Sequence, residues 1–297
     1  MSDSFQIAPV ALPLAAAFIY SVSGLFLKRA MAEGAGLVRV SLIAIGLIGV
    51  LFQPLFFFAE TGPTWDPWWA PLLCGFLFFG GNVFTFIAIR VGDLSVQTPM
   101  MGTKATFVAI AALLLGSGPI PAVWWWAALI SAAGVFLLTW RGGAAGKAAL
   151  KGAAMAMLSA VFFAFADACL SHFAEGFGPL PLVCLMMLSS TLMCLLALPM
   201  ISTPFSAIPR SAWRWLLPGA GLNAGQTILM GIALSVYQMP TQANILYSSR
   251  GLWSVVLVWT VGTWFGNHEG RLGHGVMPRR LIGAALMTVA IILATLG

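Results

Sequence analysis

The chain has 297 residues, of which 60% are hydrophobic and only 7% are charged. A soluble domain usually carries about 25% charged residues, so a soluble fold of this length would have too few charges to cover its surface. The mean hydropathy of +0.97 agrees with this. The net charge of +6 does not indicate nucleic-acid binding, because the basic residues stand between apolar segments and form no single basic patch. The composition therefore predicts a protein whose main solvent is lipid.

The first six residues hold one acid, Asp3, and no basic residue, so they do not resemble a cleavable signal peptide. Ten apolar segments follow, each close to the roughly 20 residues that a helix needs to cross a bilayer. Backbone polar groups in lipid must bond within their own segment, which favours helices. The predicted transmembrane helices cover residues 8–28, 37–59, 69–90, 94–115, 122–140, 150–173, 179–200, 212–236, 241–265 and 279–296. The sequence thus predicts an all-α, multi-pass integral membrane protein.

Basic residues are distributed unevenly over the nine connectors between these segments. All Lys and Arg residues except Lys104 and Arg250 lie in or beside the odd-numbered connectors. The even-numbered connectors and the termini carry the acids Asp3, Glu60, Asp66 and Glu175. Because basic flanks stay in the cytoplasm, the pattern predicts both termini outside a cell inner (plasma) membrane.

Short sequence echoes indicate an internal repeat. Ala32-Glu33-Gly34 is matched by Ala174-Glu175-Gly176, and Lys104 with Gly116 is matched by Arg250 with Gly262. The echoes predict two five-helix repeats, residues 1–146 and 147–297, within one membrane domain. An odd number of helices per repeat inverts the second copy, which places a substrate site between the two halves near the midplane in many secondary transporters.

Lys104 and Arg250 lie inside the fourth and ninth predicted helices. A charged side chain deep in a bilayer costs at least about 2.5–3.5 kcal/mol and usually faces a cavity or a partner. The repeat would bring both cations to one central cavity, where they would attract a carboxylate or a phosphate. Asp167, in the sixth segment, offers an alternative, because it would pair with one of the cations. Anion binding, static pairing and snorkelling all stay open at this point.

Helical spacing places further polar and aromatic side chains beside the two cations. The predicted substrate-binding residues are Tyr20, Asn82, Met101, Lys104, Phe163, Asp167, Asn223, Gln226, Tyr247 and Arg250. For Asn82 and Asn223, a hydrogen bond to a neighbouring helix is an equal alternative, and Phe and Met side chains in membrane helices more often pack than bind ligands.

Several stretches resemble the drug/metabolite transporter superfamily, in its ten-helix EamA-like branch. They are Tyr20–Gly24 leading to Lys28 and Glu33, the stretch from Phe84 to Gly116, and His172–Phe177, which is similar to the end of the first helix in small multidrug-resistance proteins. The resemblance covers nearly the whole chain. It implies a basket of helices around a central cavity and the export of metabolites, amino acids among them; related branches exchange sugar phosphates or nucleotide sugars.

The chain departs from this pattern at three points. Tyr20 and Phe162 stand where the small multidrug-resistance proteins carry a buried Glu. Lys104 and Arg250 stand where many EamA-like members have Pro. Family members usually keep both termini in the cytoplasm, whereas the charge pattern here predicts the opposite.

We therefore expect a secondary transporter for an amino acid or a small organic anion, acting without a cofactor or metal and not as an enzyme. Its expected partners are a small-molecule substrate and the lipid bilayer, and we expect a monomer or a weak dimer. An intramembrane enzyme using Asp167 and a non-transporting scaffold are the alternatives. No HExxH, CxxC or Walker-type motif supports catalysis. The four cysteines are predicted to be small buried hydrophobes.

Overall fold

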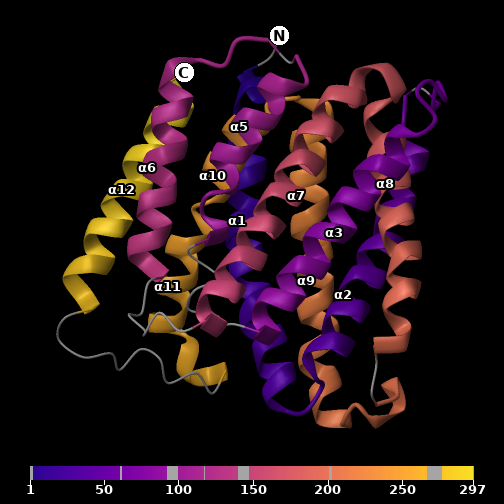
Figure 1. The fold of residues 1–297 in the computed structure, drawn as a ribbon, viewed down its shortest axis with the longest axis vertical. Coiled ribbons are helices and arrows are strands. Elements are labelled where there is room, and N and C mark those ends of the chain that lie inside the picture. Colours follow the sequence, from indigo (N-terminus) through magenta and orange to yellow (C-terminus); the bar gives the residue numbers. More distant parts are fainter. Residues whose placement is uncertain are drawn as a thin grey trace.

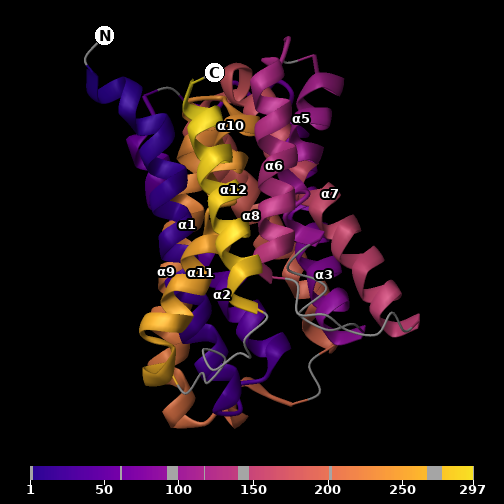
Figure 2. The same ribbon diagram turned by 90° about the vertical axis from the view of Figure 1, so that its left-hand side faces the viewer.

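The computed structural model describes residues 3–60, 62–91, 100–116, 118–139, 147–200, 203–265 and 276–296. Within these ranges the chain is all-helical and contains no β-strand (Figure 1). The long helices lie side by side along the longest axis, and the two ends of the chain lie at the same end of the bundle (Figures 1 and 2). The predicted fold class is therefore confirmed at the level of an all-helical bundle.

Each predicted segment is mainly helical where the structure describes it. The α-helices are α1 Asp3–Ala32, α2 Leu37–Phe52, α3 Ala70–Val91, α5 Lys104–Leu114, α6 Ala122–Thr139, α7 Lys147–Phe177, α8 Pro179–Met193, α9 Arg210–Val236, α10 Pro240–Tyr247, α11 Arg250–Thr260 and α12 Val276–Leu296. Four 3-10 helices are η1 Gln53–Phe58, η2 Cys194–Met200, η3 Phe205–Ala207 and η4 Gly262–Phe265. The beginning of the predicted segment 94–115 lies outside the described residues.

Six of the helices in the described ranges are long and apolar enough to cross a membrane. They cover Ile7–Ala32, Leu37–Phe58, Ala70–Ala88, Leu150–Phe177, Pro179–Leu196 and Arg210–Val236. The apolar helices Lys104–Leu114, Ala122–Leu138 and Leu281–Leu296 are shorter. Large apolar side chains such as Val50, Leu196 and Leu217 are exposed on the outside of the bundle, where a lipid solvent would meet them. This is the pattern of an integral membrane protein.

The ninth predicted segment does not form one continuous helix. A turn at Ser248 and Ser249 separates α10 from α11, and Arg250 is the first residue of α11. The fourth segment has the same feature, because a turn at Gly102 and Thr103 precedes Lys104, the first residue of α5. Both α5 and α11 contain 11 residues. The two cations thus begin half-length helices, whereas hydropathy alone had predicted them in the middle of unbroken ones.

Small residues allow two pairs of helices to pack closely. On α1, Ser23 Oγ donates to the carbonyl of Gly219 on α9 at 2.8 Å. On α7, Ser159 Oγ donates to the carbonyl of Gly81 on α3 at 2.7 Å. A side chain at Gly219 would collide with Phe26 and Leu27, because even a Cβ atom there would lie 2.9 Å from their atoms. These close approaches let a serine hydroxyl on one helix reach a backbone carbonyl on the other, in both the α1–α9 and the α3–α7 pair. Small residues have this role in membrane helices.

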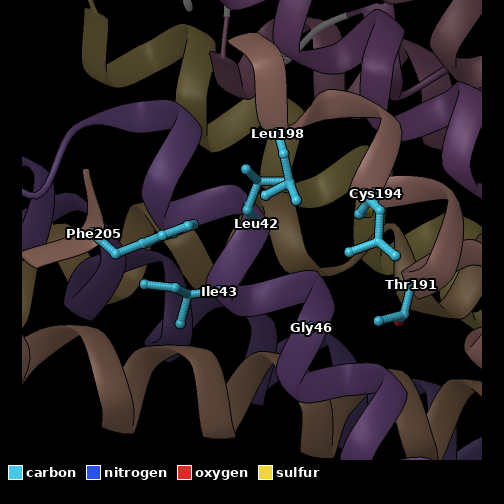
Figure 3. Close-up of a pocket in the computed structure, with 8 residues that line it drawn as sticks. Leu42, Ile43, Gly46, Thr191, Cys194, Leu198 and Phe205 are labelled. Carbon is cyan, nitrogen blue, oxygen red and sulfur yellow. The ribbon is translucent and has the colours of Figure 1, made fainter. Parts of the chain in front are cut away.

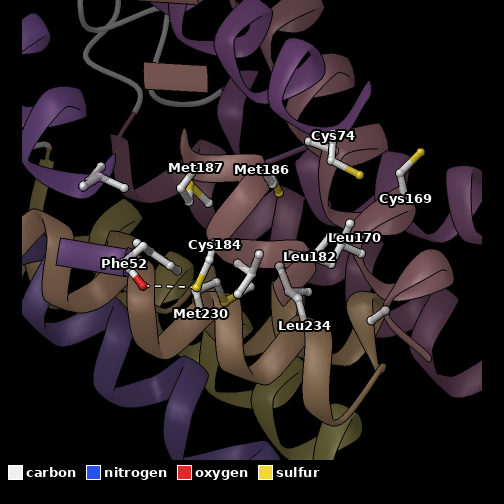
Figure 4. Packing of buried hydrophobic residues seen from close by; sticks show 14 of the residues in the cluster. Phe52, Cys74, Cys169, Leu170, Leu182, Cys184, Met186, Met187, Met230 and Leu234 are labelled. Atoms are coloured by element: carbon white, nitrogen blue, oxygen red, sulfur yellow. Dashed lines mark hydrogen bonds between the residues drawn. The ribbon is translucent and has the colours of Figure 1, made fainter. Parts of the chain in front are cut away.

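A buried apolar cluster at the middle of the bundle fixes α8 against α2, α3, α7 and α9 (Figure 4). Cys184 on α8 donates its thiol to the carbonyl of Phe52 at 3.1 Å. All four cysteines, Cys74, Cys169, Cys184 and Cys194, are buried and unbridged, which confirms the prediction of small buried hydrophobes.

Two acids with matching places in the predicted repeats have different surroundings. At one end, Glu33 after α1 accepts from Arg29 at 3.1 Å and from Trp215 of α9 at 3.0 Å. At the other end, Thr64 Oγ1 donates to the carbonyl of Gly176 at 2.7 Å, next to Glu175. The matching acids Glu33 and Glu175 therefore lie at opposite ends of the molecule.

Candidate functional site

A buried ion pair joins α5, α7 and α10. Lys104 Nζ lies 2.7 Å from Asp167 Oδ2. The same carboxylate oxygen accepts from Asn244 Nδ2 at 2.8 Å. Lys104 also lies against the ring of Phe163, with Nζ 5.5 Å from its centroid. Of the alternatives that the sequence left open for Lys104, the structure shows pairing with Asp167.

Arg250 has a different environment, made of aromatic rings. Its guanidinium carbon lies 5.0 Å from the ring centroid of Tyr20 and 4.7 Å from that of Tyr247. The Tyr247 hydroxyl donates to Gln226 Oε1 at 2.8 Å, and this bond holds the ring, which belongs to α10, against α9. None of the ion pairs among the described residues involves Arg250. Cation–π contacts stabilise a desolvated cation by about 2 kcal/mol, and they leave its charge uncompensated.

Helix α10 connects the two groups. Asn244 and Tyr247 lie three residues apart on it, so they share one face. Arg250 is within electrostatic reach of both Lys104 and Asp167. Ser21 of α1 donates to the backbone carbonyl of Arg250 at 3.0 Å and so holds the start of α11 against α1. The residues from α1, α5, α7, α9, α10 and α11 therefore form one buried polar cluster, which we call the Lys104–Arg250 cluster.

The remaining predicted site residues are placed unequally. Asn223 joins the cluster, because its Oδ1 accepts from Gln226 Nε2 at 3.3 Å. Asn82 instead donates to the carbonyl of Phe78 in its own helix at 2.9 Å. Met101 is half-buried just before the turn that precedes Lys104. Asn82 and Met101 thus have no described contact with either cation. For Met101 this agrees with the packing alternative, whereas Asn82 bonds within its own helix and not to the neighbouring helix that the alternative named.

Asn244 is the cluster member that the sequence analysis missed. Its spacing from Tyr247 and Ser248 would have placed it on the cation-facing side of the ninth segment. Asn244 is 1% exposed, and its Oδ1 has no hydrogen-bond partner among the described residues. Both N–H groups of Asn244 donate, one to Asp167 and one to the Pro240 carbonyl. Its amide therefore lies at the centre of the site as a fixed polar group.

The local electrostatics favour an anion. Each cation is the first residue of a half-length helix. Asp167 offsets Lys104, so the described charges of the cluster sum to one positive charge, on Arg250. Tyr20 is 38% exposed whereas Tyr247 is 7% exposed, so Tyr20 is the more accessible of the two rings at Arg250.

A cavity of about 150 Å³ lies elsewhere, between α2, the end of α8, η2 and η3 (Figure 3). Its lining consists of Leu42, Ile43, Gly46, Thr191, Cys194, Leu195, Leu198 and Phe205. It contains no charged side chain, so its chemistry does not match the polar solute that the sequence predicts. In the described ranges, no three His, Cys, Asp or Glu side chains are grouped so that they could hold a metal ion.

Comparison with known proteins shows the fold alone. No family model matches the chain, and no curated protein matches it. In contrast, 28 chains of solved structures match. One of them, described only as "Crystal structure of protein", superposes with a TM-score of 0.71 over 97% of this chain and 96% of its own, at 15% sequence identity. The chain therefore has an all-helical fold that is already known from solved structures.

Proposed function

We propose that the protein is a secondary transporter that moves a small polar metabolite with a carboxylate or phosphate group across a membrane. The observation that carries the proposal is the position of Arg250. It lies in a buried cluster, at a helix break, with aromatic neighbours and no acidic partner among the described residues. Ionisable groups inside a membrane domain are costly, and they mark substrate pathways by default.

The helix breaks support alternating access. Many transporters bind substrate at discontinuous helices whose positive N-termini face anionic groups. Here both cations stand at the first residue of a half-length helix, after a two-residue turn. Backbone hydrogen bonds continue through the turn before Arg250, since the N–H groups of Ser248, Ser249 and Gly251 donate to carbonyls three or four residues back.

We further propose that residues 1–146 and 147–297 are inverted repeats, with ten membrane crossings around a central cavity. The packing supports this. In the proposed repeats α7 is the equivalent of α1, and α9 is the equivalent of α3. The α1–α9 and α7–α3 pairs are then equivalent, and both pairs pack together. Exchanging α2 with α8 likewise relates the α2–α9 pair to the α8–α3 pair. The opposite positions of Glu33 and Glu175 also fit an inverted second half.

The resemblance to the drug/metabolite transporter superfamily extends the proposal to export, with an amino acid or another small organic anion as substrate. The distribution of Lys and Arg over the odd-numbered connectors supports an inner-membrane protein with its basic connectors in the cytoplasm and both termini outside. A reporter fused after residue 297 tests this orientation, and activity of a cytoplasm-specific reporter would contradict it.

The intramembrane enzyme has less support. Asp167 was its candidate acid–base group, and its Oδ2 already accepts from Lys104 and Asn244. Catalysis of this kind needs a second group placed to act with the first.

Transport is tested with purified protein in two steps. A thermal-shift screen against amino acids, organic acids and phosphate compounds finds the ligand, because a ligand stabilises the state it binds. Uptake of that ligand into proteoliposomes is then compared for the wild type and Arg250→Ala. We expect uptake by the wild type and loss of uptake in folded Arg250→Ala protein. Ligand binding without uptake in sealed vesicles would contradict a transporter.

A further inference from the structure

We infer that Asp167 determines the charge of the substrate, restricting the ligand at Arg250 to a single negative charge. The inference rests on the proposed function, because it assigns a substrate class to the same site. The class is a small monocarboxylate, and dicarboxylates and phosphate dianions are rejected.

The first step is the occupation of Lys104. Its ammonium is held at 2.7 Å by Asp167, and Asn244 fixes the same carboxylate oxygen from a third helix. Asp167 is 5% exposed and Asn244 is 1% exposed, so the pair is shielded from water. Breaking such a buried pair costs about 3–5 kcal/mol, so Lys104 is not free to bind a second anionic group.

The second step is the geometry around Arg250. Its distances to the Tyr20 and Tyr247 rings are 5.0 and 4.7 Å, and the two ring centroids are 6.0 Å apart. Rings on opposite faces of the guanidinium would be separated by nearly the sum of the two distances. The two rings therefore do not lie on opposite faces of the guanidinium, and the inference places the acceptor where neither ring covers it. A carboxylate there would receive two parallel hydrogen bonds.

The third step is charge balance. With Lys104 and Asp167 cancelling, one carboxylate at Arg250 brings the described charges of the cluster to zero. A second negative charge would stay uncompensated inside the bundle and within electrostatic reach of Asp167, which is costly in a low-dielectric interior.

Thermal stabilisation of the purified protein by propionate and by succinate tests this. The two acids carry one and two carboxylates, and both are small enough to probe a site for a larger ligand. We expect the wild type to be stabilised at a propionate concentration about tenfold or more below that of succinate, which is the scale of one unit charge near the site. Asp167→Asn frees Lys104, so this preference should fall by about tenfold or reverse.

Three further variants complete the test, and the first keeps it independent of folding because neither partner of the ion pair is left charged alone. Lys104→Gln/Asp167→Asn removes both charges and should keep the wild-type preference for propionate. Lys104→Gln alone leaves Asp167 unpaired and should weaken propionate binding about tenfold. Asp66→Asn makes the same charge change in an exposed connector and should alter nothing.

The outcomes separate the two proposals. A preference that is unchanged in Asp167→Asn and Lys104→Gln, or a wild type that prefers succinate, overturns the inference while leaving anion binding intact. If neither acid stabilises the wild type, or Arg250→Gln is stabilised as the wild type is, the anion site of the proposed function fails as well.

Discussion

The ammonium of Lys104 lies 2.7 Å from the carboxylate of Asp167, and this contact ties α5 to α7 inside the bundle. Lys104 and Arg250 are therefore unequal, although both begin half-length helices. One cation is neutralised by a carboxylate, and the other contacts aromatic rings. In the proposed function, this difference assigns anion binding to Arg250 and not to the pair of cations.

The ion pair predicts a large loss of stability when one partner is removed. Asp167→Ala leaves Lys104 buried without a counter-charge, so we expect a loss of about 3–5 kcal/mol. Replacing both partners, as in Lys104→Met/Asp167→Leu, should recover most of it, because an apolar pair of similar volume needs no charge compensation. Unfolding of the purified variants in detergent measures both. A single variant as stable as the wild type would show that the pair does not hold α5 and α7 together.

Close packing of α1 on α9 predicts a position-specific effect of one methyl group. In Gly219→Ala the new Cβ would lie 2.9 Å from atoms of Phe26 and Leu27, so we expect a loss of about 1–3 kcal/mol. Gly221, two residues along the same helix, has nothing within 4 Å of such a Cβ. Gly221→Ala should be neutral or stabilising by up to about 1 kcal/mol, because Ala favours helix more than Gly. Equal melting temperatures for the two variants would be inconsistent with this packing.

Two substitutions at Tyr247 distinguish the role of its ring from the role of its hydroxyl. Tyr247→Phe keeps the ring beside Arg250 but leaves Gln226 Oε1 without its donor, at a cost of about 1–3 kcal/mol. Tyr247→Leu also removes the cation–π contact. We expect anion binding, measured by ligand-induced thermal shift, to weaken more in Tyr247→Leu than in Tyr247→Phe. The reverse order would mean that the hydroxyl, and not the ring, positions Arg250.

Glu33 predicts a dependence of stability on pH. Hydrogen bonds from Ser211 and Trp215, with the charges of Arg214 and Arg29, lower the pKa of the Glu33 carboxyl, although partial desolvation opposes them. A carboxyl with a lowered folded-state pKa stabilises the protein above its unfolded-state pKa. That contribution is lost as the pH falls through the folded-state pKa.

Glu33→Gln should therefore lower the melting temperature near neutral pH and lose this difference at acid pH. Glu175→Gln, at the opposite end of the bundle, is the matched control. A constant difference between wild type and Glu33→Gln across the acid range would contradict the role of the ionised carboxylate.

Hydropathy predicted the helices well because burial in lipid imposes long apolar segments. It could not predict the breaks before Lys104 and Arg250, because Gly102-Thr103 and Ser248-Ser249 are tolerated inside membrane helices. Helical spacing nevertheless placed Tyr247 beside Arg250 correctly. The two residues are three apart, and their side chains are in contact although a turn separates α10 from α11.

The pairing of Lys104 with Asp167 depends on how α5 lies against α7. Spacing within one helix carries no information on that, so anion binding, pairing and snorkelling all stayed open. Spacing from Tyr247 would have placed Asn244 on the same helix face, but its hydrogen bond to Asp167, 77 residues away in the sequence, follows only from the packing of α10 against α7.

The most direct test of anion transport at Arg250 is uptake into proteoliposomes by wild type, Arg250→Lys and Arg250→Gln, using the acid that most stabilises the purified protein. Arg250→Lys keeps the charge but loses the two parallel hydrogen bonds of a guanidinium. The account predicts rapid uptake by the wild type, slow uptake by Arg250→Lys and none above empty vesicles by Arg250→Gln, with all three proteins folded. Uptake by Arg250→Gln at the wild-type rate would contradict it.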